Sequence, residues 1–377
     1  MKTKYLTTEK KISKGYSAFS HVFYKGLIVA ILGILVLSSC KKKNDEPKVT
    51  PTGPKPEWAP NIKPEMQAVI EKLASFGAPP LTTLTAQEAR KQPSFADALK
   101  AVMQENGISM PHTNVDTTGK NIPVQGGSIH LRVYTPQSGN GPFPVIVYYH
   151  GGGWVIANLD TYDASARALA DKAGAVLVSV AYRQAPEYKF PTAHNDSYAA
   201  YQWVLNNAST INGDPTKVAV VGESAGGNLA AAVSIMARDN GIALPVHEVL
   251  VYPIAGIDTT TASYNKYVTS KPLNKPLMEW FFAKYLPDAE AGHNPLINLV
   301  GANLAGLPPT TIISAQLDPL QSEGEMLADK LQTAGVTVTQ KTFEGVTHEF
   351  FGMGAVVPDA EQAENMAADE LKKSFNK

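Results

Sequence analysis

The feature that most constrains this chain is a serine set among glycines, Gly222-Glu-Ser-Ala-Gly-Gly227. An apolar run, Val218 to Val221, comes directly before it, and a run of small helix-tolerant residues, Asn228 to Val233, follows. This order predicts a strand, a sharp turn and a helix, the context in which a nucleophilic serine is held. Glycines on both sides remove the Cβ atoms that would clash in such a turn. Because the motif alone is weak evidence, it needs partners elsewhere in the chain.

Strand-like and helix-like segments alternate through most of the sequence. Strands are expected at 128–134, 143–149, 175–181, 218–221, 249–254, 310–315 and 336–343, and helices at 162–173, 193–207, 323–334 and 360–375 and directly after the serine. This alternation predicts the α/β class, a mostly parallel central sheet flanked by helices on both faces. In such a sheet the active site is expected at the carboxyl ends of the strands.

Two further regions interrupt or precede this alternation. Apolar residues at helical spacing predict helices near 64–76, 85–90 and 95–103, so we assign 61–115 to an N-terminal helical cap and 116–377 to the catalytic domain. An irregular insert at 255–298 carries four aromatic residues, Trp280, Phe281, Phe282 and Tyr285. We expect this insert to contribute to a substrate pocket, with ordinary packing as the alternative.

The N-terminal segment has the pattern of an export signal. An eleven-residue apolar run, Leu27 to Leu37, follows Lys25 and is short for a membrane span. It ends in Leu37-Ser-Ser-Cys40, which resembles a bacterial lipobox. We therefore expect residues 1–39 to be a lipoprotein signal peptide, Cys40 to carry the lipid, and 40–60 to be a disordered tether. The expected product is an exported lipoprotein anchored to a bacterial membrane, the outer one by preference, and facing the periplasm or the surface.

Composition excludes several functional classes. A formal net charge of −1 gives no basic footprint for nucleic acid. The single cysteine excludes an internal disulfide framework and a cysteine-cluster metal site. We expect no metal and no cofactor, and the sequence leaves the oligomeric state open.

Catalysis by serine needs a base and an acidic residue that orients the base. In an α/β-hydrolase these follow the serine in the order acid, then histidine, which leaves His247, His293 and His348 as possible bases. Only His348 lies in a loop just after a predicted strand, the last one. Asp318 directly follows the strand predicted at 310–315, and the proline after it ends that strand. We therefore predict a Ser224–His348–Asp318 triad.

A glycine loop supplies the third element of the chemistry. His150-Gly-Gly-Gly-Trp154 follows the predicted strand at 143–149. Consecutive glycines let the backbone approach a ligand and direct N–H groups at it. Such a loop provides donors to an oxyanion, together with the N–H of the residue after the nucleophile, Ala225.

These motifs together resemble the bacterial hormone-sensitive-lipase-like esterases, α/β-hydrolases with a helical cap, from about Pro64 to the C-terminus. The shared residues are HGGGW at 150–154, YRQAPE at 182–187, GESAGG at 222–227, Asp318-Pro-Leu320 and His348. The resemblance implies that Gly152, Gly153 and Ala225 donate to the oxyanion, and that His150 and Gly151 support the loop. It also implies that Arg183 and Glu187 are structural. The chain departs from the family in having Glu223 before the serine, where aspartate is more common, and Ala157 where glycine is common.

The predicted activity is hydrolysis of short-chain acyl esters of small molecules through an acyl-enzyme. Because His348 must be neutral to accept a proton, activity should be lost below about pH 6.5. Two alternatives stay open at this point: a deacetylase that acts on acetylated polysaccharide, and a binding lipoprotein that has kept the fold without activity.

Overall fold

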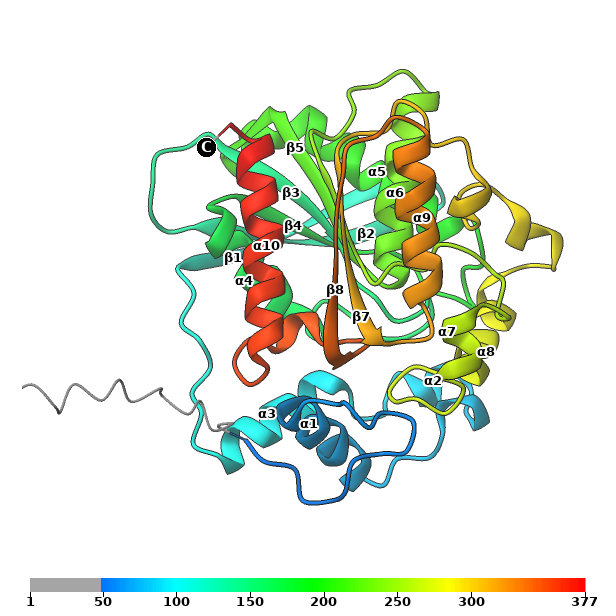
Figure 1. Ribbon diagram of the computed structural model, residues 1–377. Coiled ribbons are helices and arrows are strands. Elements are labelled where there is room, and N and C mark those ends of the chain that lie inside the picture. Colours follow the sequence, from blue (N-terminus) through cyan, green and yellow to red (C-terminus); the bar gives the residue numbers. More distant parts are fainter. Residues whose placement is uncertain (1–48, 377) are drawn as a thin grey trace, which may run out of the picture. The chain divides into compact units, whose positions relative to one another are not determined.

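The computed structural model describes residues 49–376, which contain one sheet and helices on both of its faces (Figure 1). The helices are α1 (Pro64–Ser75), α2 (Ala86–Ala89), α3 (Phe95–Glu105), α4 (Asp163–Ala173), α5 (Thr192–Asn207), α6 (Ala225–Asp239), α7 (Ala262–Lys266), α8 (Lys275–Tyr285), α9 (Gln321–Thr333) and α10 (Pro358–Ser374). The strands are β1 (Val115–Val124), β2 (Gly127–Pro136), β3 (Phe143–Tyr149), β4 (Val176–Ala181), β5 (Gly213–Glu223), β6 (Glu248–Val251), β7 (Thr310–Leu317) and β8 (Val338–Thr347).

Within the described residues the sheet has eight strands in the order β1-β2-β4-β3-β5-β6-β7-β8. From β4 onward all neighbours are parallel, whereas β1 pairs antiparallel with β2 and β2 antiparallel with β4. The predicted fold class is thus confirmed. Strand β1 was not predicted, because it is a polar edge strand in which only Val115 and Ile122 are buried.

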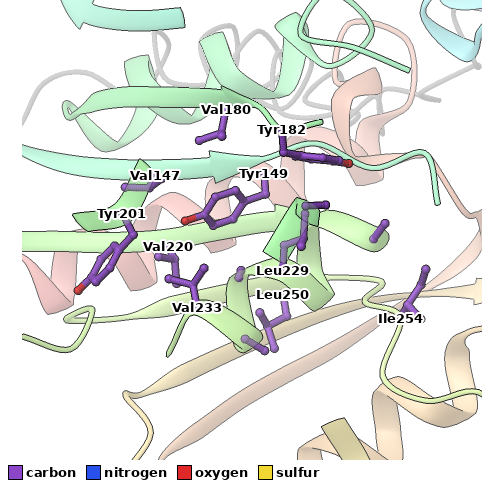
Figure 2. Packing of buried hydrophobic residues seen from close by; sticks show 14 of the residues in the cluster. Val147, Tyr149, Val180, Tyr182, Tyr201, Val220, Leu229, Val233, Leu250 and Ile254 are labelled. Carbon is purple, nitrogen blue, oxygen red and sulfur yellow. The ribbon is translucent and has the colours of Figure 1, made fainter. Parts of the chain in front are cut away.

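Alternate residues of the central strands supply two hydrophobic layers. Val147 and Tyr149 of β3 pack with α5 and α6 on one face, whereas Ile146 and Tyr148 pack with α4 and α10 on the other. Figure 2 shows the first layer, where strand residues lie against Leu229 of α6. Strand β3 is therefore buried on both faces and reads as a continuous apolar run, as expected for a central parallel strand.

The N-terminal helices lie at one end of the sheet, the end toward which the arrows of β7 and β8 point in Figure 1. Helices α2 and α3 begin with reciprocal capping boxes, at Thr85–Glu88 and Ser94–Asp97, which define where each helix begins. Helices α1 and α3 pack on each other through Val69, Val102 and neighbouring apolar residues. Helices α1, α2 and α3 all lie within residues 61–115.

The expectation of a disordered tether is wrong for residues 49–60. Val49 and Ala59 are buried, and the backbone N–H of Thr52 donates to the Glu71 carboxylate at 2.6 Å. Proline density and charge suggested a free linker, but this stretch packs against α1. The predicted signal peptide and Cys40 lie outside the described residues. No helix within 49–376 is long and apolar enough to cross a membrane.

The insert at 255–298 is more regular than expected. It contains α7 and α8, and the four aromatic residues all lie on α8. The five buried residues of α8 recur at helical spacing, which is the signal in the sequence that predicts this helix: Leu277, Met278, Phe281, Phe282 and Tyr285.

Candidate active site

Ser224 lies in a strained turn between β5 and α6. Its backbone has φ 56° and ψ −118°, a positive-φ conformation that non-glycine residues rarely adopt. A Cβ on Gly222 would lie 1.9 Å from the carbonyl oxygen of Gly226. A Cβ on Gly226 would lie 1.9 Å from the backbone carbonyl oxygen of Tyr149. The two glycines are therefore required for the close approach of strand and helix that forms the turn.

The structure brings Ser224, His348 and Asp318 together in one hydrogen-bonded row. His348 Nε2 lies 2.9 Å from Ser224 Oγ, and His348 Nδ1 lies 2.7 Å from Asp318 Oδ2. Asp318 directly follows β7 and His348 directly follows β8, so both side chains come from carboxyl ends of parallel strands. All three residues are buried. The backbone N–H of Leu320 donates to Asp318 Oδ1 at 2.9 Å and fixes the orientation of the carboxylate.

The electrostatics of this row favour a basic histidine. Burial disfavours the charged form of His348, but the charge of Asp318 and its hydrogen bond outweigh burial and raise the pKa of His348 above its usual value. His348 can therefore accept a proton at Nε2 and keep it as the imidazolium.

The glycine loop lies beside the serine with N–H groups available. Within residues 49–376 no acceptor takes the backbone N–H of Gly152, Gly153 or Ala225. Gly152 and Gly153 have φ values of 99° and 59°, which favour glycine. His150 Nδ1 lies 2.8 Å from the carbonyl oxygen of Gly151, and the His150 ring stacks on Tyr182 at 4.4 Å. Burial lowers the pKa of His150 to about 4, so this ring is neutral and braces the loop.

Two aromatic residues of α8 have different roles, one at the glycine loop and one in the packing against Trp154. The Phe281 ring would lie 2.2 Å from a Cβ on Gly153, so glycine is needed there for α8 to approach the loop. Tyr285 stacks on Trp154 at 4.5 Å below the loop. Phe281 lines the cavity, as predicted for the insert, whereas Tyr285 is ordinary packing.

A cavity of about 810 Å³ opens onto the serine. It is shared by the N-terminal helices, the glycine loop, α8 and the site, with Leu73, Leu81, Leu277 and Phe281 among its apolar walls and Ser224, His348 and Glu349 among its polar ones. This volume suits a small organic ligand. Ala157 also lines the cavity, and its φ of 67° explains why glycine would be favoured at this position.

Glu223, the departure beside the serine, has a structural explanation. Its buried carboxylate accepts hydrogen bonds from the hydroxyls of Tyr148 and Tyr252. Burial raises the pKa of Glu223 to about 7, although both hydroxyls oppose that shift. Tyr148 lies on β3 and Tyr252 just after β6, so Glu223 ties β5 to its neighbours on both sides.

Two residues of the site, Tyr162 and Glu349, were not predicted from the sequence. Tyr162 and Glu349 line the cavity, and the Tyr162 hydroxyl donates to the Glu349 carboxylate. Burial raises the pKa of Glu349, against the opposing charge of His348. The position of Glu349 next to His348 was the available signal, but its partner is 187 residues away.

Other predicted residues have structural roles. Arg183 pairs with the buried Asp196 at 2.7 Å, and Glu187 pairs with Arg90, directly after α2, at 2.7 Å. Among the described residues no cluster of three or more histidine, cysteine, aspartate or glutamate side chains could hold a metal ion.

Comparisons with known proteins show the family of the chain. A family model described as alpha/beta hydrolase fold matches residues 146–352. Carboxylesterase NlhH of Mycobacterium tuberculosis is 38% identical over 66% of this chain and 79% of its own length. Ethyl acetate hydrolase of Pseudomonas putida is 29% identical over 83% of this chain and 98% of its own length. The crystal structure of a thermostable esterase from Pseudomonas putida ECU1011 superposes with a TM-score of 0.77 at 33% identity, covering 84% of this chain and 98% of that one.

Proposed function

Because the chain belongs to the alpha/beta hydrolase fold family, and within it to the bacterial hormone-sensitive-lipase-like esterases, we propose that it is a serine carboxylesterase that uses Ser224, His348 and Asp318. The class, carboxylic ester hydrolysis, follows from its esterase relatives. We assign these three residues because hydrogen bonds link Ser224 Oγ to His348 and His348 to Asp318.

In the proposed mechanism Ser224 Oγ attacks the acyl carbonyl carbon while His348 Nε2 takes the hydroxyl proton. Asp318 holds Nδ1–H and stabilises the imidazolium without taking the proton. The backbone N–H groups of Gly152, Gly153 and Ala225 stabilise the oxyanion, where each donor typically contributes about 3 kcal/mol. His348 then protonates the leaving alcohol, and water releases the acid from the acyl-enzyme.

The experiment that tests this proposal is hydrolysis of p-nitrophenyl butyrate by the wild type and Ser224→Ala. We expect the variant to lose nearly all activity but to unfold at the same urea concentration as the wild type. A folded variant with wild-type activity would refute the role of Ser224.

We propose that the substrates are esters with short acyl chains. Phe281 fills the space directly beside Gly153 of the glycine loop, which limits the length of an acyl chain that extends on that side. A series of p-nitrophenyl esters from C2 to C12 should therefore show its highest kcat/KM at C2 to C6. Release of acetate from acetylated xylan at a comparable kcat/KM would instead favour a polysaccharide deacetylase.

We also propose that the chain is exported and lipid-anchored through Cys40, on the strength of the apolar run Leu27 to Leu37 and the Leu-Ser-Ser-Cys sequence. Metabolic labelling with an alkyne fatty acid should mark the wild type but not Cys40→Ser. Equal labelling of both would contradict the anchor.

A further inference from the structure

Glu349 occupies a backbone position that costs free energy for any residue with a side chain. It directly follows His348 and has φ 70°, in the left-handed region that favours glycine. Strained conformations of this kind persist where the surrounding structure imposes them, and they concentrate at functional sites. The strain at this position therefore indicates that the Glu349 side chain has a function.

The Glu349 carboxylate is fixed beside the reacting atoms. The Tyr162 hydroxyl lies 2.7 Å from Oε1 and 2.8 Å from Oε2. Glu349 Oε1 lies 4.0 Å from His348 Nε2, the atom that exchanges protons with Ser224. The side chain is 21% exposed and lines the same cavity as Ser224 and His348. The single hydroxyl leaves other lone pairs of the carboxylate free to accept.

A separation of 4.0 Å is too long for direct hydrogen bonding, but it is a distance that one water molecule hydrogen-bonded to both atoms can span. We propose that Glu349 positions the hydrolytic water of deacylation by accepting its second hydrogen while His348 Nε2 accepts the first. This inference rests on the proposed acyl-enzyme mechanism and adds a residue to it.

The step conserves atoms and charge. The water oxygen attacks the acyl carbonyl carbon, and one water proton passes to His348 Nε2. The other hydrogen stays on the attacking oxygen, hydrogen-bonded to Glu349, which is not itself protonated. When the tetrahedral oxyanion collapses, the bond from carbon to Ser224 Oγ breaks and Oγ takes the proton from the imidazolium. The products are the free serine and the carboxylic acid.

The role of the second hydrogen gives a specific test, because methanol has only one hydroxyl hydrogen. Methanol can donate to His348 Nε2 but has nothing to donate to Glu349. In mixtures of water and methanol, p-nitrophenyl butyrate partitions between butyrate and methyl butyrate at the common acyl-enzyme. Loss of a hydrogen bond to a carboxylate should slow attack by water about tenfold or more and leave methanol attack nearly unchanged.

The variants are Glu349→Ala and Glu349→Gly, with Asp329→Asn as the control. Asp329 is exposed on α9 and does not line the cavity. We expect the ratio of methyl butyrate to butyrate to rise about tenfold in both Glu349 variants and to stay at the wild-type value in Asp329→Asn. The rate constant of the p-nitrophenol burst, which reports acylation, should stay within about threefold of the wild type.

Glu349→Gly separates this role from a folding defect. Since glycine accepts φ 70° without strain, this variant should unfold at a higher urea concentration than Glu349→Ala and still show the altered ratio. A wild-type ratio in both Glu349 variants would overturn the inference, even if kcat fell. Failure of the proposed function is distinct, because the wild type would then give no product that depends on Ser224.

Discussion

The hydroxyl of Tyr252 donates a hydrogen bond to the carboxylate of Glu223, the residue that precedes the serine. The Tyr252 ring in turn lies 4.4 Å from the ring of His348. Through these two contacts Tyr252 links the end of β5, which directly precedes Ser224, to the ring of His348, the base. Glu223 thus stabilises the positions of Ser224 and His348, although its side chain does not line the cavity that the substrate would enter.

Glu223→Asp should weaken this link. Aspartate is one methylene shorter, so its carboxylate cannot keep both the Tyr148 and Tyr252 hydroxyls at hydrogen-bond distance. We expect a loss of about 1–3 kcal/mol in the free energy of unfolding, because a buried hydroxyl is left unsatisfied. Urea denaturation at pH 6 measures this change. Unchanged stability would mean that the tyrosines follow the shorter side chain.

The pH profile should report the raised pKa of His348. The base acts only when neutral, so activity falls as pH decreases through the pKa of His348 in the folded enzyme. Since Asp318 raises that pKa above 6.5, the acidic midpoint of kcat/KM should lie above pH 6.5, higher than the sequence suggested. A midpoint at or below pH 6.5 would contradict the electrostatic account.

Asp318→Asn should lower kcat about 10³- to 10⁴-fold, because asparagine cannot stabilise the imidazolium and favours the wrong tautomer of His348. Steady-state kinetics with p-nitrophenyl butyrate measures the loss. Asp329→Asn is the control, since Asp329 is exposed on α9 and should keep wild-type kinetics. Equal activity of the two variants would remove Asp318 from the mechanism.

Gly153→Ala should disturb the loop through contact with α8. The new Cβ would lie 2.2 Å from the Phe281 ring, so the loop or the helix must move. A displacement of about 1 Å can cost about 10²-fold in kcat. Combining Gly153→Ala with Phe281→Ala removes the clash and should recover part of the activity, with Phe281→Ala alone as the reference. No recovery would mean that backbone strain at φ 59° dominates.

Much of the site could be predicted because each member of the row directly follows a strand. Ser224 and Asp318 come after β5 and β7, whose apolar runs are visible in the sequence, and His348 comes after the more polar β8. Parallel strands bring their carboxyl ends to one edge. The glycine loop after β3 was predictable for the same reason.

The parts that could not be predicted depend on contacts between distant segments or on polar surfaces. Tyr162 and Glu349 are separated by 187 residues and meet only because α4 and the loop after β8 pack together. Strand β1 has few buried side chains and no apolar alternation. The order of residues 49–60 depends on their contacts with α1, which composition does not encode.

The most direct test of the central claim is mass spectrometry of the protein after reaction with a fluorophosphonate. We predict one adduct per chain, on the peptide that contains Ser224, with loss of esterase activity in proportion to labelling and no adduct in Ser224→Ala. Labelling at another residue in step with inactivation, or full activity after complete labelling of Ser224, would contradict the assignment of Ser224 as the nucleophile.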